Sequence, residues 1–253
     1  MPLLQVDQVT RRFGGITAVK GVSFSVEPGQ LFGLIGPNGA GKTTLFNLVT
    51  GIYAPNEGSI LLEGRSIGGL KTHRIAALGI ARTFQNIRLF GGLSVLDNVK
   101  VACHMRQKVS LLGAVTRSAA FREAEAETES VCRKLLALFQ LERFADEEAR
   151  NLPYGHQRRL EIARALATRP KLLLLDEPAA GMNPQESQEL MQLIRRLRDE
   201  FSLAVLLVEH NMKVVMGVCE RIHVVDYGQS IAEGTPEQIR HDAKVIHAYL
   251  GAE

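Results

Sequence analysis

The sequence predicts an α/β fold in which a mainly parallel sheet carries a helical insertion. Three short apolar runs, at 31–35, 172–175 and 203–208, have the length and composition of strands buried on both faces of a parallel sheet. The first 26 residues instead alternate apolar and polar positions, as antiparallel strands do, and residues 86–154 show helical spacing. We therefore expect an antiparallel β segment first and a helical segment inserted into a layered α/β core.

Composition places the chain among globular proteins but does not identify its partner. Of 253 residues, 45% are hydrophobic and 23% charged, enough to bury the core of one large domain. The apolar runs fall far short of the ~20 residues that cross a membrane, and the first ten residues lack a secretory signal pattern, so we expect a cytoplasmic protein. A net charge of +3 is too small to indicate nucleic acid as the main partner. The three cysteines form no CxxC pair and are expected to be reduced core residues.

Residues 36–43, with the sequence GPNGAGKT, match the phosphate-binding pattern GxxxxGK[ST]. The match lies between an apolar strand and a helical run at 44–50, which is the context that a P-loop requires. Its glycines let backbone N–H groups point at phosphate oxygens, Lys42 is placed to reach the β- and γ-phosphates, and Thr43 is placed to bind Mg²⁺. The residues predicted to bind the nucleotide here are Gly36, Asn38, Gly39, Gly41, Lys42, Thr43 and Thr44. The predicted fold is therefore a P-loop NTPase with a RecA-like core.

A second apolar strand ends in two acids. Asp176 follows the run 172–175 and is predicted to hold Mg²⁺ through water, because open α/β sheets bind ligands at the carboxyl ends of their strands. Glu177 is next, so both acids face the nucleotide only if the chain turns out of the strand there, which Pro178 favours. Glu177 is then the candidate to orient and deprotonate the attacking water, with a purely structural acid as the alternative.

Two further polar residues end predicted strands. His210 ends the strand that begins at 203, where it fits a sensor of the γ-phosphate, although a lone histidine is more often structural. Gln85 ends a short predicted strand, 81–84, just before the helical insertion. It is placed there to bind Mg²⁺ and to couple the γ-phosphate to movement of the insertion, but a glutamine alone carries no such information.

Taken in order, these residues resemble the ATP-binding subunits of ABC transporters, over essentially the whole chain. The resemblance assigns the Walker A loop to 36–43, the Q-loop to Gln85, the signature to LPYGH at 152–156, the Walker B strand to 172–176, the catalytic glutamate to Glu177, the D-loop to GMNP at 181–184 and the switch histidine to His210. Within a single ABC ATPase domain, 1–253, it implies a nucleotide-binding core at 1–85 and 158–235, a helical subdomain at 86–157 and a helical tail at 236–253.

The resemblance also implies which residues contact the adenine and how the signature segment contacts the nucleotide. Phe13 sits where the family places an aromatic ring under the adenine, with an ordinary core strand residue as the alternative. The usual signature is LSGGQ, whose serine contacts the γ-phosphate held by the opposite subunit, whereas Pro153 has neither a hydroxyl nor an N–H. Pro153, Gly155, His156 and the start of the following helix are still expected to face that nucleotide. Asn183 replaces the usual D-loop aspartate.

Local strings place the chain nearer to one subclass. YGHQRRLEIAR at 154–164, DEPAAGMNP at 176–184 and GTPEQI at 234–239 are similar to the branched-chain amino-acid importers. This resemblance implies ATP and Mg²⁺ between two ATPase subunits, as a homodimer or heterodimer, two transmembrane permeases and a periplasmic or lipoprotein substrate-binding protein. It implies a peripheral place at the cytoplasmic face of the inner (plasma) membrane, with no nucleic acid.

Other functions remain open at this stage. Urea or short-amide importers and lipopolysaccharide-export ATPases share similar strings. A soluble ABC ATPase that acts on DNA or the ribosome usually has two tandem cassettes or long coiled-coil arms, whereas this chain has one cassette and no sustained heptads. A P-loop kinase or GTPase that is not an ABC protein would not account for the signature helix or for His210.

Overall fold

The computed structural model describes residues 1–106 and 118–250, which form two compact units. The first unit contains residues 1–82 and the chain from residue 171 onward, and the second contains residues 83–170. The expected helical subdomain, 86–157, lies within the second unit, which also takes in the rest of the helix after the signature. The last three residues of the expected tail, 251–253, lie outside the described part.

The first unit begins with an antiparallel sheet of four strands. Their order is β2-β1-β4-β5. The strands are β1 (Leu4–Phe13), β2 (Ile16–Val26), β4 (Glu57–Leu62) and β5 (Arg65–Ser66). β1 pairs with both β2 and β4, and its inward side chains Leu4 and Val6 alternate with exposed ones. The expected antiparallel segment is confirmed.

A second sheet, of six strands, forms the centre of the first unit. Its order is β10-β9-β3-β8-β7-β6. The strands are β3 (Leu31–Ile35), β6 (Ile80–Arg82), β7 (Leu172–Asp176), β8 (Ala204–Val208), β9 (Arg221–Asp226) and β10 (Gln229–Gly234). All pairs are parallel except β9 with β10, and every residue of β3, β7 and β8 is buried. The three apolar runs are therefore the buried parallel strands that the sequence predicted. β6 ends at Arg82 rather than at Phe84.

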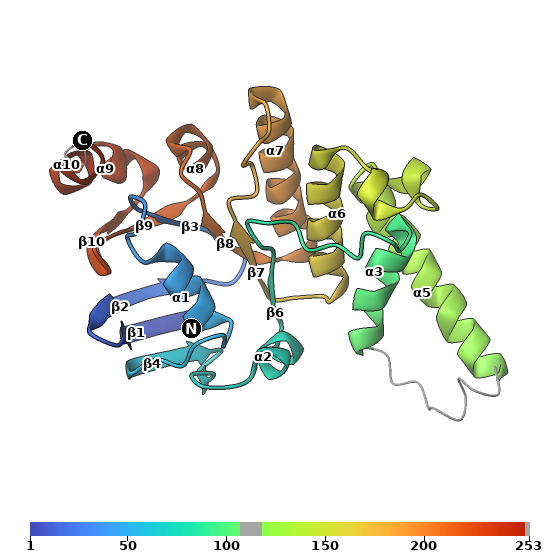
Figure 1. Ribbon diagram of the computed structural model, residues 1–253, viewed down its shortest axis with the longest axis horizontal. Coiled ribbons are helices and arrows are strands. Elements are labelled where there is room, and N and C mark those ends of the chain that lie inside the picture. Colours follow the sequence, from blue (N-terminus) through green and yellow to red (C-terminus); the bar gives the residue numbers. More distant parts are fainter. Residues whose placement is uncertain (107–117, 251–253) are drawn as a thin grey trace. The chain divides into compact units, whose positions relative to one another are not determined.

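Helices cover both faces of this sheet. They are α1 (Lys42–Val49), α2 (Thr72–Leu78), α7 (Pro184–Phe201), α8 (Met212–Val218), α9 (Pro236–Arg240) and α10 (Ala243–Leu250). Leu34 and Leu206 share one core cluster with Phe46 of α1 and with the antiparallel sheet. Gly33, between such positions, faces Val215 of α8 on the other side. Figure 1 shows α7 to α10 on the face of the sheet opposite α1.

The second unit is helical. Its main elements are α3 (Val95–Cys103), α5 (Ala119–Leu138) and α6 (Tyr154–Ala167), with short 3₁₀ turns at His104–Arg106, Glu142–Phe144 and Ala149–Asn151. α3 packs on both α5 and α6. Cys132 and Cys219 are buried, as expected, whereas Cys103 is part exposed with its Sγ 3.3 Å from that of Cys132, and all three are free thiols. Across the described residues, no helix has the length and apolarity needed to cross a membrane.

A buried histidine links β9 to β10. His223 Nδ1 lies 2.8 Å from the Glu233 carboxylate, and its Nε2 lies 2.9 Å from the Ser230 hydroxyl. Arg221 also contacts Glu233, at 2.5 Å. The hydrogen bond from His223, and secondly that from Arg221, hold the pKa of Glu233 below its ordinary value, against the opposing effect of burial. This carboxylate therefore stabilises the folded state in a pH-dependent way.

We expect Glu233→Gln to lower the free energy of unfolding by about 2 kcal/mol at pH 7, because it removes charge-assisted hydrogen bonds. Since folding lowers the pKa of Glu233, this stabilisation is present above the ordinary glutamate pKa of about 4.3 and is lost as the pH falls through the folded value. The difference between wild type and variant in urea unfolding should be smaller at pH 3 than at pH 7. Ser230→Ala, which removes the neutral partner of His223, is the control whose effect should not follow this pH dependence. An undiminished difference for Glu233→Gln at pH 3 would contradict the assignment.

Candidate functional site

Three neighbouring strands of the six-stranded sheet end at the same edge. β8 lies between β3 and β7, and its Val208 is in register with Leu34 on one side and Asp176 on the other. Because the strands are parallel, the segments that follow them start side by side. These segments are the P-loop after β3, the acids after β7 and the stretch that contains His210 after β8. The sheet thus gathers residues that are far apart in the sequence.

The phosphate-binding loop requires glycine where the backbone passes closest to other segments. A Cβ on Gly36 would lie 2.0 Å from the carbonyl oxygen of Val225, and one on Gly41 would lie 2.7 Å from that of Ala18. Gly41 also has φ 101°, a left-handed value that favours glycine, and it caps the start of α1. The backbone near Val225 and Ala18 therefore leaves no room for a side chain at these two positions of the loop.

Lys42 is buried at the start of α1 and points into the loop. Its Nζ donates to the carbonyl oxygens of Gly36, at 2.6 Å, and Pro37, at 2.8 Å. Burial lowers the pKa of Lys42, and the nearby carboxylates of Glu177 and Asp176 oppose that shift. The ammonium group thus lies against the loop carbonyls and within the field of the two carboxylates at the end of β7. The other predicted nucleotide-binding residues of this segment, Asn38, Gly39, Thr43 and Thr44, are exposed or part exposed.

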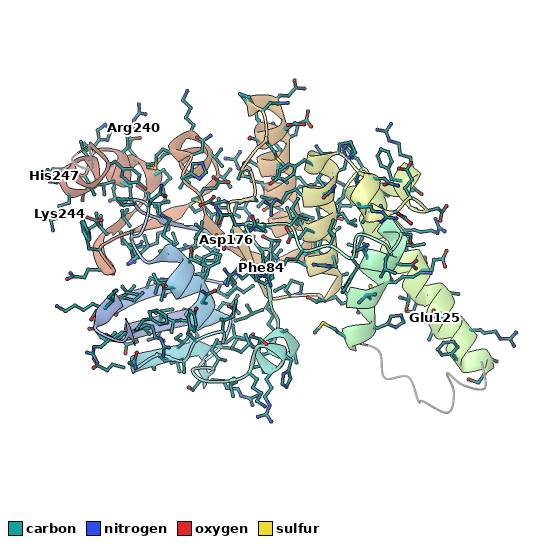
Figure 2. The ribbon with its side chains drawn as sticks, in the orientation of Figure 1. Phe84, Glu125, Asp176, Arg240, Lys244 and His247 are labelled. Atoms are coloured by element: carbon teal, nitrogen blue, oxygen red, sulfur yellow. The ribbon has the colours of Figure 1, made fainter. Side chains whose placement is uncertain are left out.

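Asp176 forms a buried ion pair that sequence reasoning missed. Arg82, the last residue of β6, donates from Nη2 to Asp176 Oδ2 at 2.9 Å, and the two side chains are 7% and 8% exposed. Arg82 Nη1 also donates to Asn47 Oδ1, at 2.7 Å, and its guanidinium lies 5.3 Å from the ring centre of Phe46. Asp176, labelled in Figure 2, is therefore oriented by the neighbouring strand and, through Arg82, by α1.

The chain leaves the strand at Glu177, as expected. Glu177 has φ 47°, in the left-handed region that is uncommon for a residue with a side chain, and its N–H donates to Val208 O at 2.9 Å. This turn brings Glu177 Oε2 to 3.6 Å from Nδ1 of His210, whose side chain is 60% exposed. The distance exceeds that of a hydrogen bond, but it places a carboxylate and an imidazole beside each other next to the phosphate cradle.

Gln85 and the signature residues belong to the second unit. Gln85 lies in a loop beyond β6, and its carbonyl oxygen accepts a 2.7 Å hydrogen bond from Arg158. Arg158 is buried in α6, where it also donates to the carbonyl oxygen of Phe84, at 2.6 Å, and pairs with Glu161, at 2.8 Å. Phe84 is labelled in Figure 2. The signature helix is thus tied to the loop that carries Gln85 by a buried arginine that the sequence did not single out.

The signature accommodates its proline at the helix boundary. Pro153 is the N-cap of α6, with φ −54° and ψ 150°, so the helix begins at Tyr154. The N–H of His156 donates to the carbonyl oxygen of Pro153 at 2.9 Å, and its ring lies edge-on to Phe144. Gly155 lies in this first turn, where N–H groups have no carbonyl partner from a preceding turn.

Asn183 has a structural role at the D-loop. It is the N-cap of α7: its side-chain oxygen accepts from the N–H of Glu186 at 2.9 Å, and the Glu186 carboxylate accepts from the N–H of Asn183 at 3.0 Å. This reciprocal capping box satisfies two N–H groups at the start of the helix. A neutral side chain therefore fixes the end of the D-loop.

Phe13 is not a core residue. It ends β1 and is 38% exposed, with its ring edge-on to Tyr53 at a centroid distance of 5.0 Å. The guanidinium of Arg11 lies 4.7 Å from the centre of the same ring. The ring is therefore held on two sides and still presents surface to solvent, as a stacking platform requires.

The residues of the first unit fit magnesium but do not form a complete metal cage. Among the described residues, no group of three or more histidines, cysteines, aspartates or glutamates is arranged to hold a metal. Mg²⁺ is usually bound by one or two protein oxygens together with phosphate oxygens and water. The Thr43 hydroxyl and the Asp176 carboxylate are a donor set of that kind, whereas Gln85, the third expected ligand, belongs to the second unit.

A family model described as ABC transporter matches residues 19–180, more than half of the chain. The chain belongs to the ABC transporter family. A second model, described as branched-chain amino acid ATP-binding cassette transporter, matches residues 229–253 of this ABC protein.

Curated relatives match over nearly the full length of both chains. The high-affinity branched-chain amino acid transport ATP-binding protein BraF of Pseudomonas aeruginosa is 49% identical over 250 residues, which is 99% of this chain and 98% of BraF. LivG of Escherichia coli K12, which has the same description, is 48% identical with the same coverage. The lipopolysaccharide export system ATP-binding protein LptB of Escherichia coli K12 is 38% identical over 253 residues, 100% of this chain and 99% of LptB.

Solved structures of ABC cassettes share the fold. The ADP conformation of MJ1267, an ATP-binding cassette of an ABC transporter, has a TM-score of 0.85 and 30% identity over 99% of each chain. A dimeric post-hydrolysis state of the cassette MJ0796 bound to ADP and Pi has a TM-score of 0.78 and 26% identity, covering 92% of this chain and 98% of that one. The predicted P-loop fold is therefore confirmed, and the chain is an ATP-binding domain of a family in which ATPase activity is expected.

The first unit should unfold more easily when Arg82 is replaced. We expect Arg82→Met to lower the free energy of unfolding by about 3–5 kcal/mol, because it leaves Asp176 buried without its charged partner. Arg12→Met, which breaks the exposed pair between Arg12 and Glu57, is the matched control and should change stability by less than about 1 kcal/mol. Urea unfolding of the three proteins checks the comparison, and equal effects of the two substitutions would refute it.

Proposed function

We propose that this ABC protein hydrolyses ATP to drive the import of branched-chain amino acids through membrane permeases. The observation that carries the proposal is the identity of 48–49%, over nearly the whole chain, to BraF and LivG, two proteins named for branched-chain amino acid transport. The match of residues 229–253 to a model of the same subclass supports it from a separate part of the chain.

In this proposal, the first unit binds the triphosphate along the P-loop. Backbone N–H groups around Gly39 and the start of α1 contact phosphate oxygens, and Lys42 moves its ammonium from the loop carbonyls to the β- and γ-phosphates. Thr43, Asp176 and Gln85 would hold Mg²⁺, which would neutralise charge on the phosphate oxygens. Phe13 stacks on the adenine.

Glu177 and His210 carry the chemical step. Their side chains are 3.6 Å apart at the sheet edge where the P-loop begins, so a water between Glu177 and the γ-phosphate lies within reach of the carboxylate. Glu177 orients this water and accepts its proton, while His210 contacts the γ-phosphate. Catalysis then consists mainly of positioning and of neutralising charge, as is usual for phosphoryl transfer.

The assembly that we propose has two ATPase subunits, as a homodimer or heterodimer, and two permeases. Each ATPase completes the site of the other with Pro153, Gly155 and His156 of its signature helix. The permeases dock on the second unit, which places this chain as a peripheral subunit at the cytoplasmic face of the inner (plasma) membrane. A periplasmic or lipoprotein binding protein delivers the substrate, and no nucleic acid takes part.

Lipopolysaccharide export is the second candidate. The observation that favours it is the 38% identity to LptB over the full chain, which is lower than the identity to BraF and LivG. The two functions differ in their membrane partners, so isolation of the complex separates them.

Isolating the complex tests the assembly. The full chain, tagged in its own cell, is purified from membranes solubilised in mild detergent, and its partners are identified by mass spectrometry. We expect a second ATPase and two multi-span permeases, and radiolabelled leucine uptake that is lost when the gene is deleted. Recovery of lipopolysaccharide-export components without a change in leucine uptake would establish the second candidate instead. Recovery of ribosomal or DNA-repair proteins alone would overturn both.

Glu177→Gln should lower ATP turnover by about 100-fold or more, because the amide cannot accept a proton from water. ATP affinity should stay within about threefold of wild type, since Lys42 and the P-loop are unchanged. Turnover of the purified complex and nucleotide binding are measured side by side. Glu189→Gln, at an exposed glutamate of α7, is the matched control and should hydrolyse ATP normally. Wild-type turnover of Glu177→Gln would exclude this residue as the base.

Pro153→Ser should raise the ATPase activity of the assembled complex severalfold. Serine restores a hydroxyl and an N–H at the N-cap of α6, where either group can donate to the nucleotide of the opposite subunit. The effect should appear in the complex and be absent from the isolated chain. Unchanged activity of the complex would remove position 153 from the proposed site.

A further inference from the structure

Glu209 is a buried carboxylate between β8 and His210 to which the proposed function gives no role. It is 1% exposed, although an isolated carboxylate at such a place is costly unless it is hydrogen-bonded. Its Oε1 accepts a 2.9 Å hydrogen bond from the N–H of Ala179, in the turn that follows Glu177. A glutamate after the strand thus reaches across to the loop that follows the neighbouring strand.

A second hydrogen bond joins the same two segments. The N–H of Glu177 donates to Val208 O at 2.9 Å, so the turn after β7 is fixed to the end of β8 both by a backbone bond and by the Glu209 side chain. The two bonds are two residues apart on the turn and involve consecutive residues of the other segment. Between the two hydrogen bonds, the backbone of Glu177 adopts a left-handed conformation.

The left-handed conformation of Glu177 depends on these two hydrogen bonds. A non-glycine residue at φ 47° is in a sparsely populated region and stays there when the surrounding structure holds it. The hydrogen bond to Ala179 fixes the exit of the turn, and the backbone bond at Glu177 fixes its entry. The result is the 3.6 Å approach of Glu177 Oε2 to Nδ1 of His210, the residue that directly follows Glu209.

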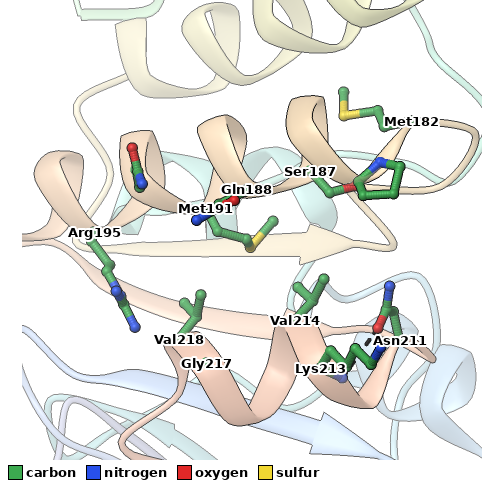
Figure 3. A pocket seen from close by; sticks show the side chains of 12 residues that line it. Met182, Ser187, Gln188, Met191, Arg195, Asn211, Lys213, Val214, Gly217 and Val218 are labelled. Atoms are coloured by element: carbon green, nitrogen blue, oxygen red, sulfur yellow. Dashed lines mark hydrogen bonds between the residues drawn. The ribbon is translucent and has the colours of Figure 1, made fainter.

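The electrostatics agree with this geometry. Burial raises the pKa of Glu209, while the N–H groups of Ala179 and Asn211 and the charge of His210 lower it, and Glu177 adds to the increase. The Glu209 carboxylate is thus influenced by the charges of both members of the Glu177–His210 pair and by the backbone N–H groups of the segments that carry them. Figure 3 shows one residue from the loop after β7, Met182, and one from the segment after β8, Asn211. Both lie at the same end of a pocket of about 570 Å³ between α7 and α8.

We propose that Glu209 is a positioning residue for ATP hydrolysis: its carboxylate holds the turn at 177–181 so that Glu177 stays beside His210. The inference rests on the proposed role of Glu177 as the base. Glu209 touches neither the nucleotide nor the water, and acts through the backbone of Ala179.

The test compares Glu209→Ala with Glu209→Gln in the full chain, using the purified membrane complex for turnover. Without an acceptor for the Ala179 N–H, Glu209→Ala should lower kcat by about 10- to 100-fold and change KM and ATP affinity by less than about threefold. Glu209→Gln keeps a side-chain oxygen at this place and should recover most of the lost kcat. Hydrogen exchange of the Ala179 amide should be faster in Glu209→Ala and near wild type in Glu209→Gln.

A control separates this role from a general loss of stability. Glu233→Ala removes a part-buried carboxylate elsewhere in the first unit, so it should lower the melting temperature while leaving kcat and Ala179 exchange unchanged. If Glu209→Ala keeps wild-type kcat while Glu177→Gln is inactive, the positioning role is overturned and the proposed function stands. Equal losses of kcat and ATP affinity in Glu209→Ala, with Ala179 exchange unchanged, would also overturn it. If Glu177→Gln itself is active, Glu177 is not the base and the positioning role of Glu209 loses its premise, while the proposed transport function is unaffected.

Discussion

The site depends on the parallel pairing of β3, β8 and β7. Every residue of these strands is buried and apolar up to Asp176, so a shift of register would expose or crowd side chains on both faces of the sheet. The pairing therefore fixes where each strand ends. Because the strands themselves offer no chemistry, the polar groups begin with the last residue or the first residues beyond each strand, and all three sets emerge at one edge.

Charged groups near this edge are buried with specific partners. Asp176 has Arg82, Lys42 has two loop carbonyls, and Glu209 has the N–H of Ala179. Such pairs add little net stability compared with apolar side chains of the same size, but each charge is costly if its partner is removed. Their contribution is geometric: a buried charge that has one satisfactory arrangement holds the neighbouring backbone in that arrangement. The pair of Arg158 and Glu161 has the same character in the second unit.

The sequence predicted the elements better than the contacts between them. The strands at 31–35 and 172–175 and the P-loop were evident because each is a continuous pattern, and the turn at Glu177 followed from two adjacent acids and a proline. The roles of Arg82 and Glu209 were not predicted, because they depend on which strands are neighbours. The spacing of residues in the sequence does not determine the order of strands in a sheet.

One further difference has a local cause, and one alternative can be set aside. Phe84 was predicted to end a strand, but its carbonyl oxygen accepts from Arg158, so β6 stops at Arg82. For Phe13 the sequence predicted a ring under the adenine and left an ordinary core residue as the alternative. Its place at the last position of β1, where it is 38% exposed, disagrees with the core alternative alone.

The close approach at Gly36 restricts how this protein can evolve. The atom that a Cβ would strike is the carbonyl oxygen of Val225, which every amino acid carries, so no replacement in β9 can create the missing space. Elsewhere a neighbour can shrink to compensate for a larger residue, but at this position a second-site suppressor would have to move a strand of the central sheet. Changes to the side chains of β9 therefore cannot compensate for a larger residue at position 36.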